Sequence, residues 1–538
     1  MKTNIKITRV VMAIVAATLS TGVYAKGGSP ASGTGLYTVP TLTTPSYTIA
    51  QAAAVHGFDH VGILQSATAP SCGGTATINS IKITVPCNTI IQMPANTFRW
   101  EDMVNYSATT GKVSLIGTEL HVVGNIVNGE YIAALMYISQ QSLNSGSGVI
   151  TSIDKAAGRL TLDTGAIIEI NDPNGRFSKG QSPDPRFSVD DENPTIHAST
   201  GYPMCIPRPP IAPATDDPLC PQNNRPMSTA TTACRLFGAA GVSPLPTSGE
   251  LTQTPAGQFC RQFVMNSVAA RSATDPDPRQ QAPFEVGDYI NYSGTLIDDL
   301  GIIPYISAHT IEANVGIYTQ PHTRPSYIAM GDFGIGTADP TALTSVAGVA
   351  QETQTKIFLE AETTDVQTPV DIYIVDVNSS TGAKSYRWIS PYDMTGECNP
   401  AAALPISCMG TQGGITTQFT EAQPQRARIR ARDNKSTAVA NMTSAPGRNF
   451  AVMARSFCNP KTIDTLGHVT DTTCLNNING SKVANGLAAG MYSAPVFEYI
   501  FPENTKPGDI IVPNDFWHLP FLVNGEGNGV GALSPKPW

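Results

Sequence analysis

A chain of 538 residues is too long for one hydrophobic core, so the sequence predicts two to four domains. Only 14% of the residues are charged, whereas Gly (47) and Pro (42) are plentiful, and this composition favours turns and short strands over long helices. The formal net charge of −9 disfavours nucleic acid as a partner. No apolar stretch beyond the N-terminus approaches the roughly 18 residues of a transmembrane helix.

The first 25 residues have the pattern of a secretory signal peptide. A basic start and an apolar stretch from Val10 to Leu19 precede the small-residue cleavage site Val23-Tyr24-Ala25. We therefore expect the mature chain to begin near Lys26. Removing three of the 33 basic residues leaves 30 against 42 acidic ones, a net charge of −12. The sequence thus predicts an exported protein, extracellular or periplasmic.

The ten cysteines fall into near neighbours along the chain, and an even count in an exported protein indicates disulfides. Closing loops of this length costs little entropy, and each bridge is worth about 2 to 4 kcal/mol. No C-x-x-C occurs, which argues against redox and zinc-ribbon sites. We expect five bridges: Cys72 with Cys87, Cys205 with Cys220, Cys234 with Cys260, Cys398 with Cys408, and Cys458 with Cys474.

An internal repeat predicts two related β-modules. Gly117 to Gly124 and Gly287 to Gly294 share one glycine spacing, and a Tyr-Ile-Ser follows each, at Tyr137 and at Tyr305. Glycines within strands mark the bends that barrel strands need. The first module is predicted from short apolar runs separated by turn residues: 113–116, 120–123, 131–138, 149–153, 160–162 and 167–170. Such modules look like OB-type barrels.

The rest of the chain divides by composition. The segment between the modules is rich in proline and cysteine, and Phe263-Val-Met265 suggests a helical turn within it. After residue 345, short runs at sandwich-like spacing predict strands at 356–361, 370–377, 386–389, 416–419, 427–431, 450–455 and 495–501.

We therefore expect an all-β protein, with two OB-like antiparallel barrels, a C-terminal immunoglobulin-like β-sandwich and disulfide-stapled loops. The predicted order is a signal peptide (1–25), an extended N-terminal arm (26–85), barrel 1 (86–180), a Pro/Cys-rich excursion (181–282), barrel 2 (283–345) and the sandwich with an aromatic tail (346–538).

The C-terminal region carries a family resemblance. Glu498-Tyr-Ile-Phe-Pro-Glu-Asn, Pro507-Gly-Asp and Asn514-Asp-Phe-Trp-His-Leu-Pro-Phe-Leu-Val-Asn-Gly-Glu-Gly resemble a group of secreted hypothetical proteins from fungi and bacteria. The resemblance transfers no site residue. Five apolar side chains in this region predict a tail that packs onto the sandwich or a neighbouring barrel: Phe516, Trp517, Leu519, Phe521 and Leu522.

Two groups of side chains are candidate metal ligands. His56-Gly-Phe-Asp59-His60 places two imidazoles and a carboxylate within five residues, which can bind a first-row metal if the loop curls. The alternative is a solvated turn. An acidic segment is typical of a solvated loop, and its hard oxygen donors are alternatively suited to Ca²⁺: Asp184, Asp190, Asp191 and Glu192. No other cofactor is indicated.

A row of arginines has a charge geometry of its own. Arg426, Arg428, Arg430 and Arg432 alternate with small or apolar residues, so on a strand the guanidiniums share one face. Such a row can bind carboxylate, sulfate or phosphate groups of a polyanion. Pairing with acidic neighbours, or protection of an edge strand, are the alternatives.

No hydrolase signature of high specificity is present, which favours a non-enzymatic role. We expect an extracellular binding, matrix or surface component for an anionic or polysaccharide polymer, since OB-type barrels commonly bind oligosaccharides. One alternative is a secreted polymer hydrolase whose acid and base carboxylates lie on separate strands. A metal-dependent oxidative enzyme using His56 and His60 is the third.

Overall fold

The structure is a computed structural model of the chain. It describes residues 55–93, 97–110, 116–138, 144–181, 185–187, 195–209, 216–228, 234, 254–298, 302–320, 323–336, 356–365, 370–377, 381, 383–389, 427–432, 447–454, 458, 462, 464, 468–480, 483, 486–501, 513–514, 516, 519–525 and 531–538. The expected signal peptide lies outside these residues.

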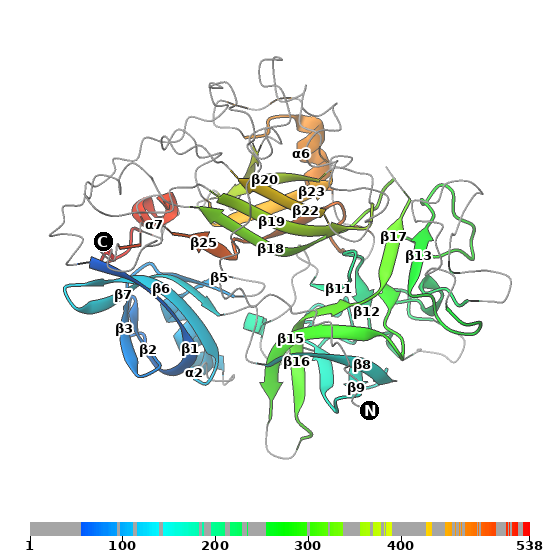
Figure 1. Cartoon of the computed structure of the whole chain (residues 1–538), viewed down its shortest axis with the longest axis horizontal. Helices are drawn as coiled ribbons and strands as arrows, with labels where there is room; N and C mark the ends of the chain where they lie inside the picture. The colour runs from blue at the N-terminus through cyan, green and yellow to red at the C-terminus, as the bar shows by residue number, and fades with distance from the viewer. Residues whose placement is uncertain are drawn as a thin grey trace, which may run out of the picture. The chain divides into compact units, whose positions relative to one another are not determined.

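The first domain is a closed five-stranded barrel, blue to cyan in Figure 1. Its strands follow the order β3-β2-β1-β6-β7, and a parallel contact between β3 and β7 closes it. The short strands β4 and β5 continue the sheet beyond β7, and helix α2 follows β5. The bounds are β1 Val55–Thr68, β2 Gly74–Ile78, β3 Ile81–Val85, β4 Ile90–Gln92, β5 Thr97–Arg99, α2 Trp100–Thr110, β6 Glu119–Val127 and β7 Glu130–Ile138.

This barrel begins well before the predicted boundary at residue 86. Three of its strands, β1 to β3, lie in the segment expected to be an extended arm. Alternation explains their formation, because Ile83 and Val85 are buried while the residues beside them are more exposed. Trp100 of α2 is fully buried in the same core, and its indole Nε1 donates to the Thr68 carbonyl oxygen at 2.8 Å.

The second domain is a barrel with the same connectivity. Its order is β10-β9-β8-β15-β16, closed by a parallel contact between β10 and β16. The strands predicted at 149–153, 160–162 and 167–170 thus belong to this barrel and not to the first. The bounds are β8 Asn144–Asp154, β9 Arg159–Leu162, β10 Ile167–Ile170, β15 Tyr289–Ile297 and β16 Tyr305–Ala313.

The glycine repeat marks equivalent strands in the two barrels. Gly117 and Gly287 have the same φ of +95°, and a nine-residue strand starts two residues after each. A β-bulge occurs at the second glycine of each repeat, Gly124 and Gly294. The Tyr-Ile-Ser part of the prediction is wrong, since Tyr137 lies near the end of β7 whereas Tyr305 begins β16.

A long insertion separates β10 from β15, at the place that α2 occupies between β3 and β6 of the first barrel. Its strands pack into the same hydrophobic core as the second barrel, whereas Phe187 in its first short helix packs into the core of the first barrel. The predicted helical turn at Phe263 is wrong: β13 forms there and pairs in parallel with β17. The bounds are η1 Pro185–Phe187, β11 Ile196–Ala198, β12 Met204–Cys205, η2 Gln222–Asn224, β13 Gln262–Met265, β14 Ala282–Pro283 and, after β16, β17 Gly316–Thr319.

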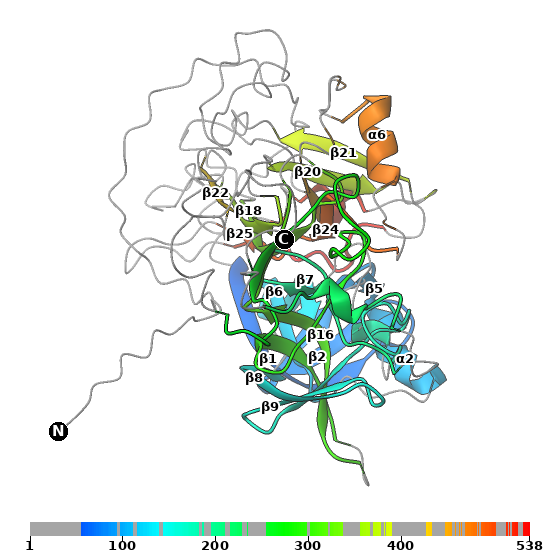
Figure 2. The same cartoon turned by 90° about the vertical axis from the view of Figure 1, so that its right-hand side faces the viewer.

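The C-terminal region contains two four-stranded sheets, in the orders β22-β19-β18-β25 and β21-β20-β23-β24. Both contribute to one hydrophobic core, which helix α6 also joins (Figure 2). The first strand, β18, starts before the predicted boundary at residue 346. The bounds are β18 Ile328–Gly336, β19 Lys356–Thr363, β20 Val370–Val377, β21 Lys384–Ile389, β22 Ala427–Arg432, β23 Asn449–Ala454, α6 Thr472–Asn479, β24 Met491–Pro495, β25 Glu498–Ile500 and α7 Pro520–Asn524.

The aromatic tail packs as predicted. Phe516, Leu519, Phe521 and Leu522 are buried in the core of the C-terminal sheets, whereas Trp517 lies outside the described residues. The side chain of Asn125 on β6 fastens the tail to the first barrel. Its amide nitrogen donates to the carbonyl oxygens of Asn514 at 3.0 Å and Pro537 at 2.6 Å.

Four disulfides join the expected partners: Cys72–Cys87, Cys205–Cys220, Cys234–Cys260 and Cys458–Cys474. Cys398 and Cys408 lie outside the described residues, so their pairing stays a prediction. Within the described part of the chain, none of the helices has the length and hydrophobicity needed to span a membrane.

Candidate functional site

The structure separates the three candidate metal ligands near the N-terminus. His56, Asp59 and His60 lie on the extended strand β1 and not on a curled loop. Phe58 lies between the two histidines, and its ring centroid is 5.1 Å from that of His60. Asp59 has the opposite strand parity, and its Oδ1 is 2.6 Å from Nε2 of His121. The three side chains therefore do not converge on one point.

The predicted calcium ligands Asp184, Asp190, Asp191 and Glu192 lie outside the described residues. Nearby Asp172 is buried, and its Oδ2 accepts backbone N–H bonds from Phe177 at 2.6 Å and Ser178 at 3.0 Å. This carboxylate shapes the turn that follows β10. Among the residues that the structure describes, no cluster of three or more His, Cys, Asp or Glu could hold a metal ion.

The arginine row forms a strand, as predicted. Arg428, Arg430 and Arg432 lie on β22 at the edge of its sheet, and Arg426 falls outside the described part. The register places Arg428 opposite Glu360 and Arg432 opposite Lys356.

One face of the second barrel brings together polar and aromatic side chains from three strands, of which Glu169 and Tyr305 are buried and Arg159 is partly exposed. Arg159 on β9 is the register partner of Glu169 on β10, and its Nε lies 2.8 Å from Oε2 of Glu169. The guanidinium also stacks on the ring of Tyr305, 4.6 Å from its centroid. Burial raises the pKa of Glu169, against the opposing effect of Arg159.

An apolar loop end borders this face. Leu296 at the end of β15 is 45% exposed, and Ile302 and Ile303 before β16 are 45% and 67% exposed. Exposed apolar groups that cluster in this way are typical of interaction surfaces.

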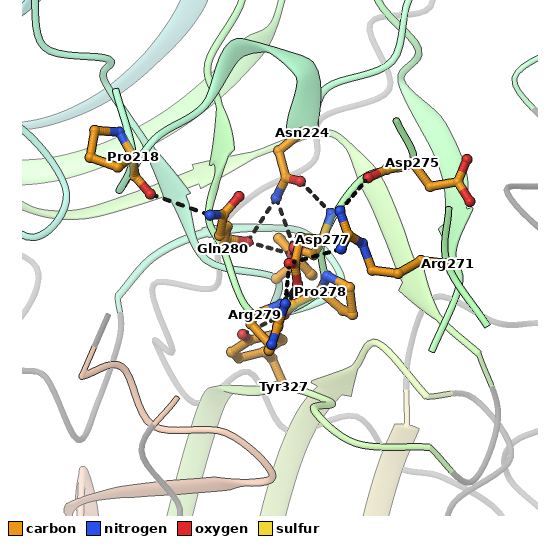
Figure 3. Close-up of polar contacts among 10 residues, drawn as sticks. Pro218, Asn224, Arg271, Asp275, Asp277, Pro278, Arg279, Gln280 and Tyr327 are labelled. Carbon is orange, nitrogen blue, oxygen red and sulfur yellow. Dashed lines mark hydrogen bonds and ion pairs between the residues drawn. The ribbon is translucent and has the colours of Figure 1, made fainter. Parts of the chain in front are cut away.

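A network of polar groups fixes the segment from Asp275 to Gln281 in the insertion (Figure 3). The amide nitrogen of Asn224 lies 3.0, 2.9 and 3.1 Å from the carbonyl oxygens of Asp277, Gln280 and Gln281. Two buried tyrosines also donate hydrogen bonds to this segment. The Tyr202 hydroxyl donates to the Gln280 carbonyl oxygen at 2.5 Å, and the Tyr327 hydroxyl donates to the Pro278 carbonyl oxygen at 2.7 Å.

The carboxylate of Asp277 lies between two arginines in this network. Oδ2 is 2.7 Å from Nη2 of Arg279 and 3.5 Å from Nη1 of Arg271. Burial opposes ionisation, but the hydrogen bonds from Arg279 and the charges of both arginines lower the pKa of Asp277 on balance. The group is therefore an anion at neutral pH.

A second network joins the insertion to the barrel. Gln222 donates to Oε1 of Glu285 and accepts from Nζ of Lys155 at 3.1 Å. Burial is the main cause that raises the pKa of Glu285 to about 7; Arg225 and Gln222 oppose it and Asp288 adds to it. Such a carboxyl group can exchange a proton near neutral pH.

Asp288 is not available as a catalytic partner for the carboxyl group of Glu285. The two oxygens of Asp288 bind Arg225 at 2.8 and 3.0 Å, and the Glu285 amide donates to Oδ2 at 2.9 Å. The Asp288 side chain is also only 2% exposed. It therefore cannot act as a nucleophile or activate water, and the pair does not form a hydrolase site.

Ser307, His309 and Glu169 are the nearest arrangement to a nucleophile, base and acid. The imidazole Nδ1 of His309 bonds the Thr310 hydroxyl at 2.9 Å, and no hydrogen bond joins His309 to Ser307. Each side chain is nearly inaccessible, at 1% exposure. A polymer could not reach them without unfolding the barrel.

Sequence reasoning missed Glu285, Asp277 and the Arg159–Tyr305 stack. The Asp-Pro-Asp-Pro run at 275–278 was a readable signal for a rigid turn. The raised pKa of Glu285 leaves no local trace in the sequence, because the burial that causes it comes from tertiary contacts. Searches of family models, curated proteins and solved structures find no match to this chain. The resemblance of the C-terminal region to secreted proteins stays a prediction.

Proposed function

We propose that this chain is a secreted binding protein, a surface or matrix component that holds an extracellular polysaccharide or related polymer. We place the binding surface on the second barrel, at the apolar loop end beside the Arg159–Tyr305 stack. The observation that carries the proposal is the exposure of Leu296, Ile302 and Ile303 next to this polar and aromatic face. Sugar rings stack on apolar surfaces while their hydroxyls need polar partners, and the partly exposed Arg159 side chain is such a partner.

The domain types support this proposal. The shared strand order of the two barrels, with one parallel closure each, agrees with an OB-type assignment. The two C-terminal sheets agree with an immunoglobulin-like sandwich, because the chain crosses between them repeatedly: β18 and β19 lie in one sheet, β20 and β21 in the other, β22 in the first, β23 and β24 in the second, and β25 in the first again. OB-type barrels bind oligosaccharides in some proteins, and immunoglobulin-like sandwiches occur in many cell-surface domains, so the support is at the level of the fold.

A polysaccharide array tests the proposal. The mature protein should bind at least one polymer, and an Ile302→Ser/Ile303→Ser variant should bind it at least ten-fold more weakly, since it loses two exposed contacts. Val286→Ser is the matched control, because Val286 is 61% exposed but lies on another loop. Equal binding by the Ile302/Ile303 variant and the wild type, or no polymer bound at all, would contradict the proposal.

The arginine strand offers a second surface for anionic polymers. If β22 binds a polyanion, Arg428→Gln/Arg430→Gln should weaken binding several-fold at low salt and leave the urea midpoint nearly unchanged. If the row serves only to protect the sheet edge, the double variant should bind as the wild type does and aggregate more readily. Binding titrations at two salt concentrations separate these outcomes.

A further inference from the structure

The chain contains six Asp-Pro bonds, and the one at Asp277–Pro278 has a distinctive environment (Figure 3). An Asp-Pro bond is the peptide bond most easily broken by acid. The aspartate carboxylate can attack its own carbonyl carbon, and the tertiary prolyl nitrogen is more basic than an ordinary amide nitrogen. The folded environment decides whether the two reacting groups are held together.

The Asp277 carboxylate is folded back along the bond that it could attack. Its Oδ1 accepts a hydrogen bond from the backbone nitrogen of Arg279 at 3.0 Å, two residues further along. This is an Asx-turn, in which the side chain lies over the following peptide unit. Nε of Arg279 holds the same oxygen at 2.9 Å, so the carboxylate stays in this position.

The Asp277 carbonyl oxygen faces two side-chain donors from other parts of the fold. The Asn224 amide nitrogen lies at 3.0 Å. The Tyr202 hydroxyl lies at 3.3 Å; its shorter bond goes to the Gln280 carbonyl at 2.5 Å, and its single proton can turn toward the Asp277 oxygen as negative charge develops there. Fixed donors at a carbonyl oxygen stabilise the negative charge that develops when a nucleophile adds to the carbon. The tyrosine stays a donor, since burial, Tyr327 and Asp277 hold its pKa well above the usual value.

The surrounding charges keep the nucleophile ionised in mild acid. Arg271 and Arg279 face the carboxylate, and Asp275 binds Arg271 through its carbonyl oxygen at 3.2 Å. The cleavage rate depends on the ionised fraction of the carboxylate multiplied by the concentration of acid. A lowered pKa therefore lets the rate continue to rise at pH values where an ordinary aspartate is already protonated.

We propose that Asp277–Pro278 is an acid-triggered self-cleavage site. A carboxylate oxygen of Asp277 forms a bond to the main-chain carbonyl carbon, and the displaced electron pair moves to the oxygen held by Asn224 and Tyr202. The C–N bond then breaks, its electron pair goes to the Pro278 nitrogen, and a solvent hydronium ion supplies the proton. Water opens the resulting cyclic anhydride, which restores the side-chain carboxyl group and leaves a new main-chain carboxyl group on Asp277. The net reaction consumes one water molecule.

Cleavage would produce fragments that end at Asp277 and begin at Pro278. None of the four described disulfides spans this bond, because three lie before it and Cys458–Cys474 lies after it. The fragments would stay associated in the native protein, since β8 to β10 and β15 to β16 come from different fragments but form one barrel. Processing would thus be invisible until the protein is denatured.

The bond Asp217–Pro218 is an internal control. Its carboxylate also forms an Asx-turn, with the Leu219 nitrogen at 3.0 Å, and also binds an arginine, Arg208, at 2.8 Å. Both carbonyl oxygens accept a backbone N–H, from Gln280 at 3.0 Å at Asp277 and from Cys220 at 3.2 Å at Asp217, but within the described residues no side-chain donor reaches the Asp217 oxygen. The two bonds differ mainly in the donors at the carbonyl.

The test is to incubate the native protein at pH 7 and pH 4.5, confirm folding by circular dichroism, and analyse it on non-reducing denaturing gels and by mass spectrometry. We expect a fragment beginning at Pro278 to accumulate at pH 4.5, at least ten-fold faster than a break at Asp217–Pro218. Unfolding in urea should remove this advantage. Tyr202→Phe should slow the reaction several-fold, and Pro278→Ala should abolish it. Equal rates at the two bonds in the native protein, or no break at Asp277–Pro278, would overturn the proposal.

Discussion

At the scale of single residues, burial on the second barrel controls the protonation of two side chains in opposite directions. His309 is the extra residue of the β16 bulge, which places it in the barrel wall at 1% exposure. Burial lowers its pKa to about 4, so the ring is neutral in the folded protein. Glu285 is instead held in its protonated form up to about neutral pH.

The first prediction concerns His309 and acid stability. As the pH falls from about 6.5 to about 4, the unfolded chain takes up a proton that the folded chain does not, so stability falls. The loss amounts to about 3 kcal/mol at most. His309→Gln should remove this loss, which urea titrations at pH 7 and pH 4.5 can measure. An unchanged pH dependence in the variant would show that the ring is already solvated in the native state.

The second prediction concerns Glu285, for which stability changes with pH in the opposite direction. Its folded pKa lies above that of the unfolded chain, so stability decreases as the pH rises from about 4.5 to about 7. Glu285→Gln keeps a hydrogen-bonding side chain beside Gln222 and cannot ionise. The variant should therefore gain stability relative to the wild type at pH 8 and show little difference at pH 4.5. A gain of equal size at both pH values would point to packing rather than ionisation.

At the scale of elements, the paired glycines determine how the barrel strands bend. A Cβ at Gly124 would clash with the Ile132 carbonyl oxygen, and one at Gly294 would clash with that of Ser307. Both contacts are with backbone, which cannot move aside without disturbing the bulge. The third prediction is that Gly124→Ala and Gly294→Ala each destabilise the protein, by about 1 to 3 kcal/mol.

Gly117→Ala is the control for this pair. Its φ of +95° strains an L-residue, but the structure leaves open space where the Cβ would lie. It should therefore cost only about 1 kcal/mol. Chemical denaturation of the three variants gives the comparison. A larger loss at Gly117 than at Gly124 would mean that the turn, and not the bulge, controls the barrel.

The elements also show why part of the fold was predictable. The glycine spacing identified two equivalent strands, because a closed barrel needs the same bend at the same place in each copy. The assignment of strands to barrels failed, because β8 to β10 pair with β15 and β16 across the insertion. Only tertiary contacts reveal that pairing. Strands β1 to β3 were missed because their Thr, Ser and Gly content is also typical of an extended arm.

Some features of the candidate sites could likewise be predicted from the sequence, and others could not. The four described cysteine pairs were predictable, since their spacings along the chain are short. The environments of Glu285 and Asp277 depend on Gln222, Asn224 and Tyr202, which lie more than 50 residues away. A sequence pattern carries no information on such contacts.

At the scale of the whole molecule, the insertion and the second barrel should unfold as one unit, since they share a core. The fourth prediction is that Cys234→Ser/Cys260→Ser lowers stability by about 3 kcal/mol. It should speed hydrogen exchange in β15 and β16 as well as around the lost bridge. Cys72→Ser/Cys87→Ser is the control, and its effect should be confined to the first barrel. Exchange that rises only beside Cys234 would show that the insertion is independent.

The insertion also affects the order in which the chain can fold as it emerges from its N-terminus during synthesis. The first barrel has all of its strands once Ile138 has emerged. The second must wait for Ala313, with β8 to β10 and their unpaired edges exposed meanwhile. Cys205–Cys220 and Cys234–Cys260 can both form within that interval, because all four cysteines precede β15. The bridges would then shorten the effective loop between β10 and β15, reducing the entropy cost of joining the two halves of the barrel.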